Sequence, residues 1–191
     1  MVTDSPLDQA PRASSGPTLP PEETGPPEDA ERELGLRIAS DGDWLYQGSP
    51  IRRIELVKLF ASVLRREADG SYWLVTPVER GRIAVEDAPF VAIELARIGQ
   101  GTGQQLRLRT NLDEWVTIGP RHPIRLRRPA GVVADSAPAP YVEVRDGLEA
   151  RLVRSVYYEL VELAEERLLD GRARIGVWSE GDFFALHQSD A

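Results

Sequence analysis

Apolar residues recur at helical spacing in two stretches of the chain. In the later stretch they follow one another mostly at intervals of three and four residues: Leu148, Leu152, Val153, Val156, Tyr157, Leu160, Val161, Leu163, Ala164 and Leu168. This spacing predicts an amphipathic helix with one apolar side. Asp146 and Glu149 fit a capping box at its start, and Asp170 with Gly171 fits its end. We therefore expect one long helix between these two signals.

The earlier stretch has the same plan. Ser49 is a natural N-cap and Pro50 suits the first helical position, where its missing N–H costs nothing. The apolar stripe consists of Ile54, Leu56, Val57, Phe60, Ala61, Val63 and Leu64. Asp69 and Gly70 then end the helical pattern as Asp170 and Gly171 do, and a run rich in strand-forming residues follows each pair. Because helix, Asp-Gly and aromatic strand occur twice, we expect two structurally repeated halves.

The remaining apolar runs predict strands. Residues 36–39 and 44–46 predict a first hairpin, and residues 172–178 and 182–186 predict a last one. Further strands are expected at residues 83–85, 90–98, 104–110, 115–118 and 124–127. The sequence thus predicts an α+β fold, in which each half is an antiparallel sheet packed with one long helix.

The first 33 residues differ in composition from the rest. They contain seven of the 15 prolines, and eight acidic residues against two arginines give them a net charge of −6. Such a segment buries too little apolar surface to offset chain entropy, so we expect a disordered tail, with an acidic docking arm as the alternative. The remaining chain divides into a first half at residues 34–80, a β-rich middle at 81–140 and a second half at 141–191.

Composition narrows the classes of protein. With 191 residues and 41% hydrophobic content, the chain can form a real core. No apolar run is long enough to span a membrane, and the N-terminus lacks the basic and apolar regions of a secretory signal, so we expect a cytoplasmic protein. The absence of cysteine excludes disulfides, a thiolate nucleophile and cysteine-ligated metals.

Arginines gather in the middle of this acidic chain. Residues 106–109 and 124–127 both alternate apolar residues with arginine, and residues 97–128 hold seven arginines against Asp113 and Glu114. Guanidinium groups on one sheet face suit an anionic small molecule, while the alternative is a solvated face with cross-strand partners such as Glu94. A pI of about 4.9 and the lack of a recognition motif argue against nucleic acid. The loop with Gly99, Gly101 and Gly103 precedes a strand, so it predicts a hairpin tip and not a phosphate loop.

Two further groups of residues suggest other functions. His122 could act as a general base oriented by Asp113, which would make the protein a hydrolase, although neither a nucleophile nor a metal-ligand spacing accompanies it. Trp115 or Trp178, if exposed, could bind a protein partner, and if buried would belong to the core. We expect no cofactor and no metal.

Several segments resemble a bacterial family of proteins. They are residues 48–51, 56–64, 72–79, 83–90, Thr110 and Asn111 with Asp113, residues 121–123, 140–142 and 147–150. Together they are similar to domain of unknown function family 1285 from residue 34 to the end, with the acidic leader outside the family core. This resemblance implies an α+β fold with two repeated halves, and ligand binding or signal transduction near the junction of those halves.

The residues and the resemblance together lead to one functional prediction. We expect a non-enzymatic module that binds an anionic small molecule, or transmits a signal, through a site between the two halves. The predicted ligand contacts are Arg109, Asn111, His122 and Arg125, with Thr76 and Glu79 on the opposite side. The hydrolase and the protein-interaction scaffold are the alternatives.

Overall fold

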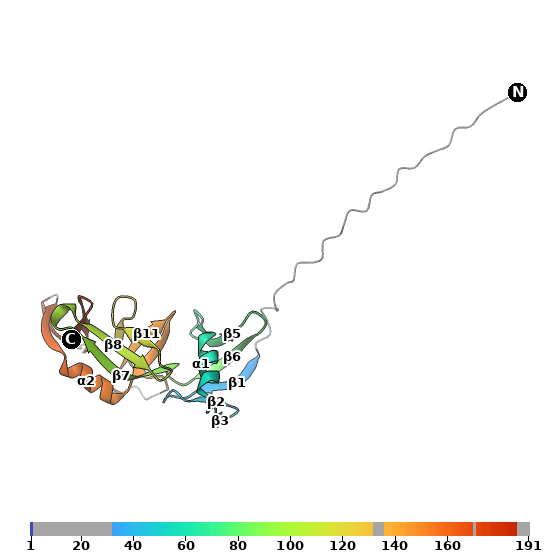
Figure 1. Ribbon diagram of the computed structural model, residues 1–191, viewed down its shortest axis with the longest axis horizontal. Coiled ribbons are helices and arrows are strands. Elements are labelled where there is room, and N and C mark those ends of the chain that lie inside the picture. Colours follow the sequence, from blue (N-terminus) through green and yellow to red (C-terminus); the bar gives the residue numbers. More distant parts are fainter. Residues whose placement is uncertain (2–31, 132–135, 170, 187–191) are drawn as a thin grey trace.

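Strands dominate the structure, which is a computed structural model that describes Met1 and residues 32–131, 136–169 and 171–186. Within those residues it contains two six-stranded sheets, one three-stranded sheet and two α-helices (Figure 1). The expected acidic tail falls almost entirely on residues outside this description, while Glu33, its last residue, begins the first strand.

The first sheet has the strand order β3-β2-β1-β6-β5-β4. Its strands are β1 (Glu33–Ile38), β2 (Trp44–Tyr46), β3 (Ser49–Pro50), β4 (Leu64–Arg66), β5 (Tyr72–Val75) and β6 (Arg80–Val85). Helix α1 (Ile54–Ser62) lies beside β1, β5 and β6 (Figure 1), and its Val57 and Ala61 are buried. All strand pairs are antiparallel except β1 with β6. We call residues 33–85 the first half.

The second sheet has the order β10-β11-β12-β7-β8-β9, and a small sheet of order β13-β14-β15 follows. The strands of the second sheet are β7 (Phe90–Ile98), β8 (Gln105–Thr110), β9 (Trp115–Thr117), β10 (Ile124–Arg127), β11 (Ala139–Arg145) and β12 (Leu148–Leu152). The small sheet comprises β13 (Glu165–Leu169), β14 (Arg172–Ser179) and β15 (Asp182–Ala185). Helix α2 (Arg154–Glu162) contacts β7 and β14. We call residues 90–186 the second half.

The prediction of one long helix in each half is wrong. Each helix has nine residues. The expected start of the later helix is strand β12, in which Leu148, Ala150 and Leu152 are buried and alternate with half-buried residues. Asp146 and Gly147 do not cap a helix; with φ values of 44° and 74° they form the turn of the β11–β12 hairpin.

The expected start of the earlier helix is also a strand. Ser49 and Pro50 form β3, which pairs with β2, and α1 begins at Ile54. Gly70, with a φ of 86°, lies in the turn between β4 and β5 and does not end a helix, and Gly171 lies in the corresponding turn between β13 and β14. Each half therefore contains a short helix followed directly by a hairpin, and the α+β class with a repeat-like layout is confirmed at this level.

The other predicted strands are confirmed with small changes of boundary. The expected divisions after residues 80 and 140 fall inside β6 and β11. The loop after β7 contains a 3-10 turn at Gly101–Gly103 and leads into β8, as a hairpin tip should.

A single cluster of buried side chains runs through both halves. Ile38 and Leu64 of the first half belong to it together with Phe90, Leu108 and Leu160 of the second. Every one of these five side chains is fully buried. The halves therefore share one hydrophobic core, which limits how far they can move apart without exposing apolar surface.

Gly81 in β6 lies against Leu34. A Cβ at this position would lie 2.6 Å from both Cδ atoms of Leu34. We expect Gly81→Ala to lower the free energy of unfolding by about 1–3 kcal/mol, because the Leu34 side chain must move to accept the methyl group. Urea unfolding measures this. The control is Gly103→Ala, whose Cβ would meet no atom within 4 Å; equal stability of the two variants would contradict the packing at Gly81.

Candidate functional site

Helix α1 contacts the second half through the loop between β8 and β9. Lys58 Nζ donates to Asp113 Oδ2 at 2.8 Å, and Arg109 Nη1 donates to Asp113 Oδ1 at 3.0 Å. Both carboxylate oxygens of Asp113 are thus in ion pairs. The hydrogen bonds from Lys58 and Arg109 hold the pKa of Asp113 below its usual value. Arg109 is also paired with Glu94, from its Nε at 2.7 Å.

Other contacts between the halves are hydrogen bonds to backbone groups. Arg145 Nη2 donates to the carbonyl oxygen of Ala61 at 2.9 Å, at the end of α1, and Nη1 of the same arginine is paired with Glu114. Asn111 Nδ2 donates to the carbonyl oxygen of Gly42 at 3.2 Å. Lys58 and Ala61 of the first half, with Asn111, Asp113 and Arg145 of the second, form what we call the junction.

The six predicted ligand contacts occupy separate places. Arg109 and Asn111 lie at or beside the junction, and the Asn111 side chain is held at both ends, because its Oδ1 accepts from the N–H of Val91 at 3.1 Å. Arg125 is exposed on β10, which three strands separate from β8 in the sheet order. The Nδ1 atom of His122 lies 3.1 Å from the carbonyl oxygen of Glu143.

Thr76 and Glu79 belong to the turn between β5 and β6. Thr76 Oγ1 donates to the carbonyl oxygen of Glu79 at 2.9 Å and accepts from its N–H at 3.0 Å. Both residues line a cavity of about 690 Å³ in the first half, which we call the α1 cavity. None of the other predicted ligand contacts lines it.

The walls of the α1 cavity are largely apolar. Leu34, Leu36, Ile51, Leu56, Phe60, Val63 and Leu74 line it, with Tyr46 and several polar residues. The ring of Phe60 is stacked on that of Trp44 at a centroid distance of 6.1 Å, which fixes one wall. The charged residues Arg32 and Glu79 are paired at 2.9 Å and both are largely exposed, so they lie where the cavity opens to solvent.

Helix α1 has one side on this cavity and another on the second half. Leu56, Phe60 and Val63 line the cavity, and Lys58 and Ala61 make junction contacts. At about 100° per residue, Lys58 falls on the side of the helix opposite Leu56 and Phe60, and the carbonyl oxygen of Ala61 lies in its last turn. A single helix thus connects a ligand-sized space to the other half of the molecule.

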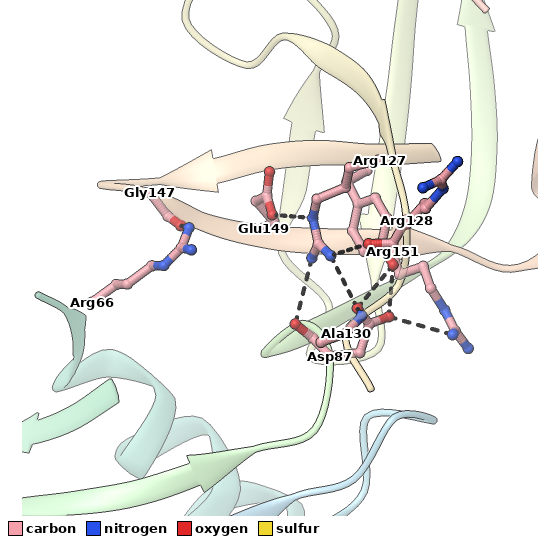
Figure 2. Close-up of polar contacts among 9 residues, drawn as sticks. Arg66, Asp87, Arg127, Arg128, Ala130, Gly147, Glu149 and Arg151 are labelled. Atoms are coloured by element: carbon pink, nitrogen blue, oxygen red, sulfur yellow. Dashed lines mark hydrogen bonds and ion pairs between the residues drawn. The ribbon is translucent and has the colours of Figure 1, made fainter. Parts of the chain in front are cut away.

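A second polar cluster, which the sequence analysis missed, surrounds Asp87 in the segment between β6 and β7. The Asp87 side chain is only 2% exposed. Tyr141 Oη lies 2.9 and 2.8 Å from its two oxygens, and Arg127 Nη1 donates to it at 3.2 Å. The N–H of Ala130 donates at 3.1 Å and Arg151 at 3.4 Å. Figure 2 shows Arg127, Ala130 and Arg151 around Asp87.

The cluster extends outward through Arg127. Its Nε donates to Glu149 at 2.9 Å, and its guanidinium lies 3.5 Å from the centre of the Tyr141 ring. Burial and the hydrogen bond to Asp87 raise the pKa of Tyr141 well above its usual value, so the hydroxyl stays a donor. Arg66 of the first half donates to the carbonyl oxygen of Gly147 at 3.2 Å on the other side of this region (Figure 2).

The alternative functions receive little geometric support. No contact within the described part of the chain joins His122 to Asp113, whose oxygens are used by Lys58 and Arg109. Trp115 is 37% exposed with Arg107 5.3 Å from its ring centre, and Trp178 is half-buried against Phe183.

The described residues contain no group of three or more His, Asp or Glu side chains that could hold a metal ion. None of their helices is long and apolar enough to cross a membrane.

Comparisons with known proteins point to one family. The N-terminal domain of DUF1285, a domain of unknown function, matches residues 20–88, and the C-terminal domain of the same family matches residues 89–186. A crystal structure of a DUF1285 family protein from Silicibacter pomeroyi has 44% identity and a TM-score of 0.73, covering 82% of this chain and 81% of that one. Another, from Shewanella baltica, has 30% identity and a TM-score of 0.51, covering 68% of this chain and 91% of that one. No curated protein matches the chain.

The match to the N-terminal domain corrects one expectation. The whole acidic leader was expected to lie outside the family core, but the match begins at residue 20 and so includes its second part. The two matches meet between residues 88 and 89, directly after Asp87. The Asp87 cluster therefore attaches the end of the region matched by the N-terminal domain to residues of the region matched by the C-terminal domain.

Asp87→Asn should destabilise the protein strongly. The amide cannot neutralise Arg127 and Arg151, so we expect a loss of about 3–5 kcal/mol in the free energy of unfolding. Tyr141→Phe, which removes one hydroxyl, should cost about 1–3 kcal/mol. Urea unfolding compares both with Asp182→Asn at an exposed position. If Asp87→Asn were as stable as the Asp182 variant, the cluster would not hold the segment between β6 and β7 in place.

The Lys58–Asp113 pair should make stability depend on pH. Because the pKa of Asp113 is lower in the folded protein than its ordinary value of 3.8, its contribution is present above that pH and is lost as the pH falls below it. The melting temperature of Asp113→Asn should therefore lie below that of the native chain at pH 6, and the gap should close in acid. Melting curves across this range check it, with Asp182→Asn as control. A gap that does not change with pH would contradict the ion pair.

Proposed function

We propose that this chain, which belongs to the DUF1285 family, is a non-enzymatic small-molecule-binding module. In this proposal the ligand enters the α1 cavity, and α1 transmits its presence to the second half through the junction. The observation that carries the proposal is the position of α1, which has the cavity on one side and Lys58 and Ala61 in contact with the second half on the other. Family membership confirms the resemblance found in the sequence and assigns no activity.

The size of the cavity supports a small organic ligand. Sites for such molecules typically enclose about 300–1,000 Å³, are mostly apolar and carry a few polar groups that fix orientation. The α1 cavity, at about 690 Å³, has seven aliphatic or phenylalanine side chains in its lining. Gln47 supplies an amide group, while the hydroxyl of Thr76 is already bonded to Glu79.

The charges favour an uncharged, mainly apolar ligand in this cavity. Arg32 is paired with Glu79 at 2.9 Å, and Glu33 is a further acidic residue in the lining. An anion would therefore meet no uncompensated positive charge there. The anionic ligand expected between the halves also finds Arg109 already occupied by Glu94 and Asp113. We therefore expect the ligand of the α1 cavity to be a largely apolar molecule and not an anion.

Transmission through α1 requires that the halves have more than one arrangement of similar free energy. The Lys58–Asp113 and Arg109–Asp113 pairs are substantially exposed, and exposed ion pairs each contribute little to stability. Contacts of this kind can rearrange without a large loss of free energy. A ligand that binds one arrangement better shifts the population toward it. We expect this to occur in the cytoplasm, which is a prediction from the sequence.

The α1 cavity should bind an uncharged apolar probe. We expect N-phenyl-1-naphthylamine to gain fluorescence with the full-length chain, and Leu56→Trp, which fills the cavity, to weaken binding about tenfold or more, which corresponds to about 1.4 kcal/mol. Fluorescence titration gives both dissociation constants. Leu56 lines the cavity.

The matched control is Leu59→Trp. Leu59 belongs to the same helix but is 60% exposed and does not line the cavity. Its substitution adds the same side chain without filling the space, so probe affinity should stay at the native value. Equal weakening by both substitutions, or no binding to the native chain, would refute the cavity as a ligand site.

A further inference from the structure

A groove of about 700 Å³ lies on the first sheet, and its lining differs in chemistry from that of the α1 cavity. Its charged residues are Arg37, Arg82 and Glu33, and we call it the arginine groove. In β1, Arg37 stands between the buried residues Leu36 and Ile38, and in β6, Arg82 stands between buried Gly81 and Ile83. Since side chains alternate along a strand, both arginines point away from the buried side of the sheet.

The two arginines come from neighbouring strands. Arg37 is paired in register with Ala84, two residues beyond Arg82, in the parallel β1–β6 pair. With strands about 4.8 Å apart and about 3.3 Å per residue, their Cα atoms are about 8 Å apart. Long side chains on such diagonal neighbours can reach one group from two sides.

The positive charge in the groove is only partly compensated. Arg82 makes no ion pair or side-chain hydrogen bond with any residue that the structure describes. Arg37 is paired with Glu86 at 3.1 Å through Nη1, and its side chain remains 49% exposed. The other acidic residue near the groove, Asp69, already accepts two hydrogen bonds from Ser71. Because Glu86 compensates Arg37, the guanidinium group of Arg82 is the one in the lining that has no ion-pair partner among the described residues.

The backbone leaves the groove accessible. Gly48 and Gly70 both line it, with φ values of 82° and 86°. A Cβ on Gly48 would meet no atom within 4 Å, and one on Gly70 would meet only the end of the Arg66 side chain at 4.0 Å. The space over these two turns is therefore open to a molecule that approaches the arginines.

We propose that the arginine groove is a second binding site, which takes an oxyanion such as a phosphate or a carboxylate group. Arg82 makes the main contact with the oxyanion and Arg37 the second. Guanidinium groups bind such oxyanions through paired, charge-assisted hydrogen bonds. Two sources could supply this chemistry. One is a free phosphorylated or carboxylated metabolite, and the other is the set of carboxylates at residues 22–31 of this chain, which come shortly before Glu33 in the sequence.

Isothermal titration of the full-length chain with pyrophosphate at low ionic strength tests the proposal. We expect saturable binding that weakens about tenfold or more in Arg82→Ala, and less in Arg37→Ala, whose guanidinium already has a carboxylate partner. Arg125→Ala is the matched control, since Arg125 is exposed in the second half and does not line the groove. Arg82→Lys keeps the charge without the planar fork and should give an intermediate affinity. Circular dichroism verifies folding, and Arg82→Lys serves if Arg82→Ala fails to fold.

A full-length variant with Glu22, Glu23, Glu28, Asp29 and Glu31 replaced by their amides separates the two sources. If the carboxylates of the chain occupy the groove, this variant binds pyrophosphate several-fold more tightly than the native chain, and the gain disappears with Arg82→Ala. If the site serves a free ligand, both backgrounds bind equally and both depend on Arg82. No binding in either background, or binding that Arg82→Ala and Arg125→Ala weaken equally, would overturn the proposal. Probe binding in the α1 cavity is measured separately, so a negative result at one site does not affect the test of the other.

Discussion

The connection between the two halves is fixed by a carboxylate that cannot be left without partners. The Asp87 side chain is almost completely buried, and an ionised group at that depth is tolerated only when it is paired and hydrogen-bonded. Its partners are Tyr141, Arg127, Arg151 and the N–H of Ala130, all from the second half. The segment leading into β7 is therefore bound to the second half before the strand begins. This attachment sets where the first half lies, and with it which side of α1 meets the loop after β8.

The site follows from that placement. On one side of α1, Phe60 and its neighbours enclose an apolar space under the first sheet. On the other side, Lys58 and Ala61 meet polar groups of the second half. The buried core is shared by both halves, whereas the Lys58–Asp113 ion pair, which joins them, is substantially exposed. A buried anchor at Asp87 with an adaptable contact at Asp113 is an arrangement in which occupancy of one half could alter the surface of the other.

The sequence predicted most strands and the two-part plan, but it misplaced the helices for an identifiable reason. Leu148 and Leu152 are four residues apart, which fits a helical turn and also two steps of strand alternation, and only the burial of Ala150 distinguishes the two. Sequence reasoning named Glu94 as a possible cross-strand partner of the arginines, and the Arg109–Glu94 pair confirms that alternative. It missed the contact between Lys58 and Asp113, which lie 55 residues apart in the chain. The Asp87 cluster left one trace in the sequence, a charged residue inside a segment that carries the family resemblance.

Hydrogen–deuterium exchange tests the central claim, that α1 carries the effect of cavity occupancy to the second half. The full-length chain would be measured with and without N-phenyl-1-naphthylamine, following the amides of α1 and of residues 110–114, which include Asp113. The account predicts that the probe changes exchange in both segments, and that Leu56→Trp, which fills the cavity, abolishes the probe's effect on both while Leu59→Trp preserves it. A change confined to the first half would show that the cavity binds its ligand without communicating with the second half, and would contradict the account.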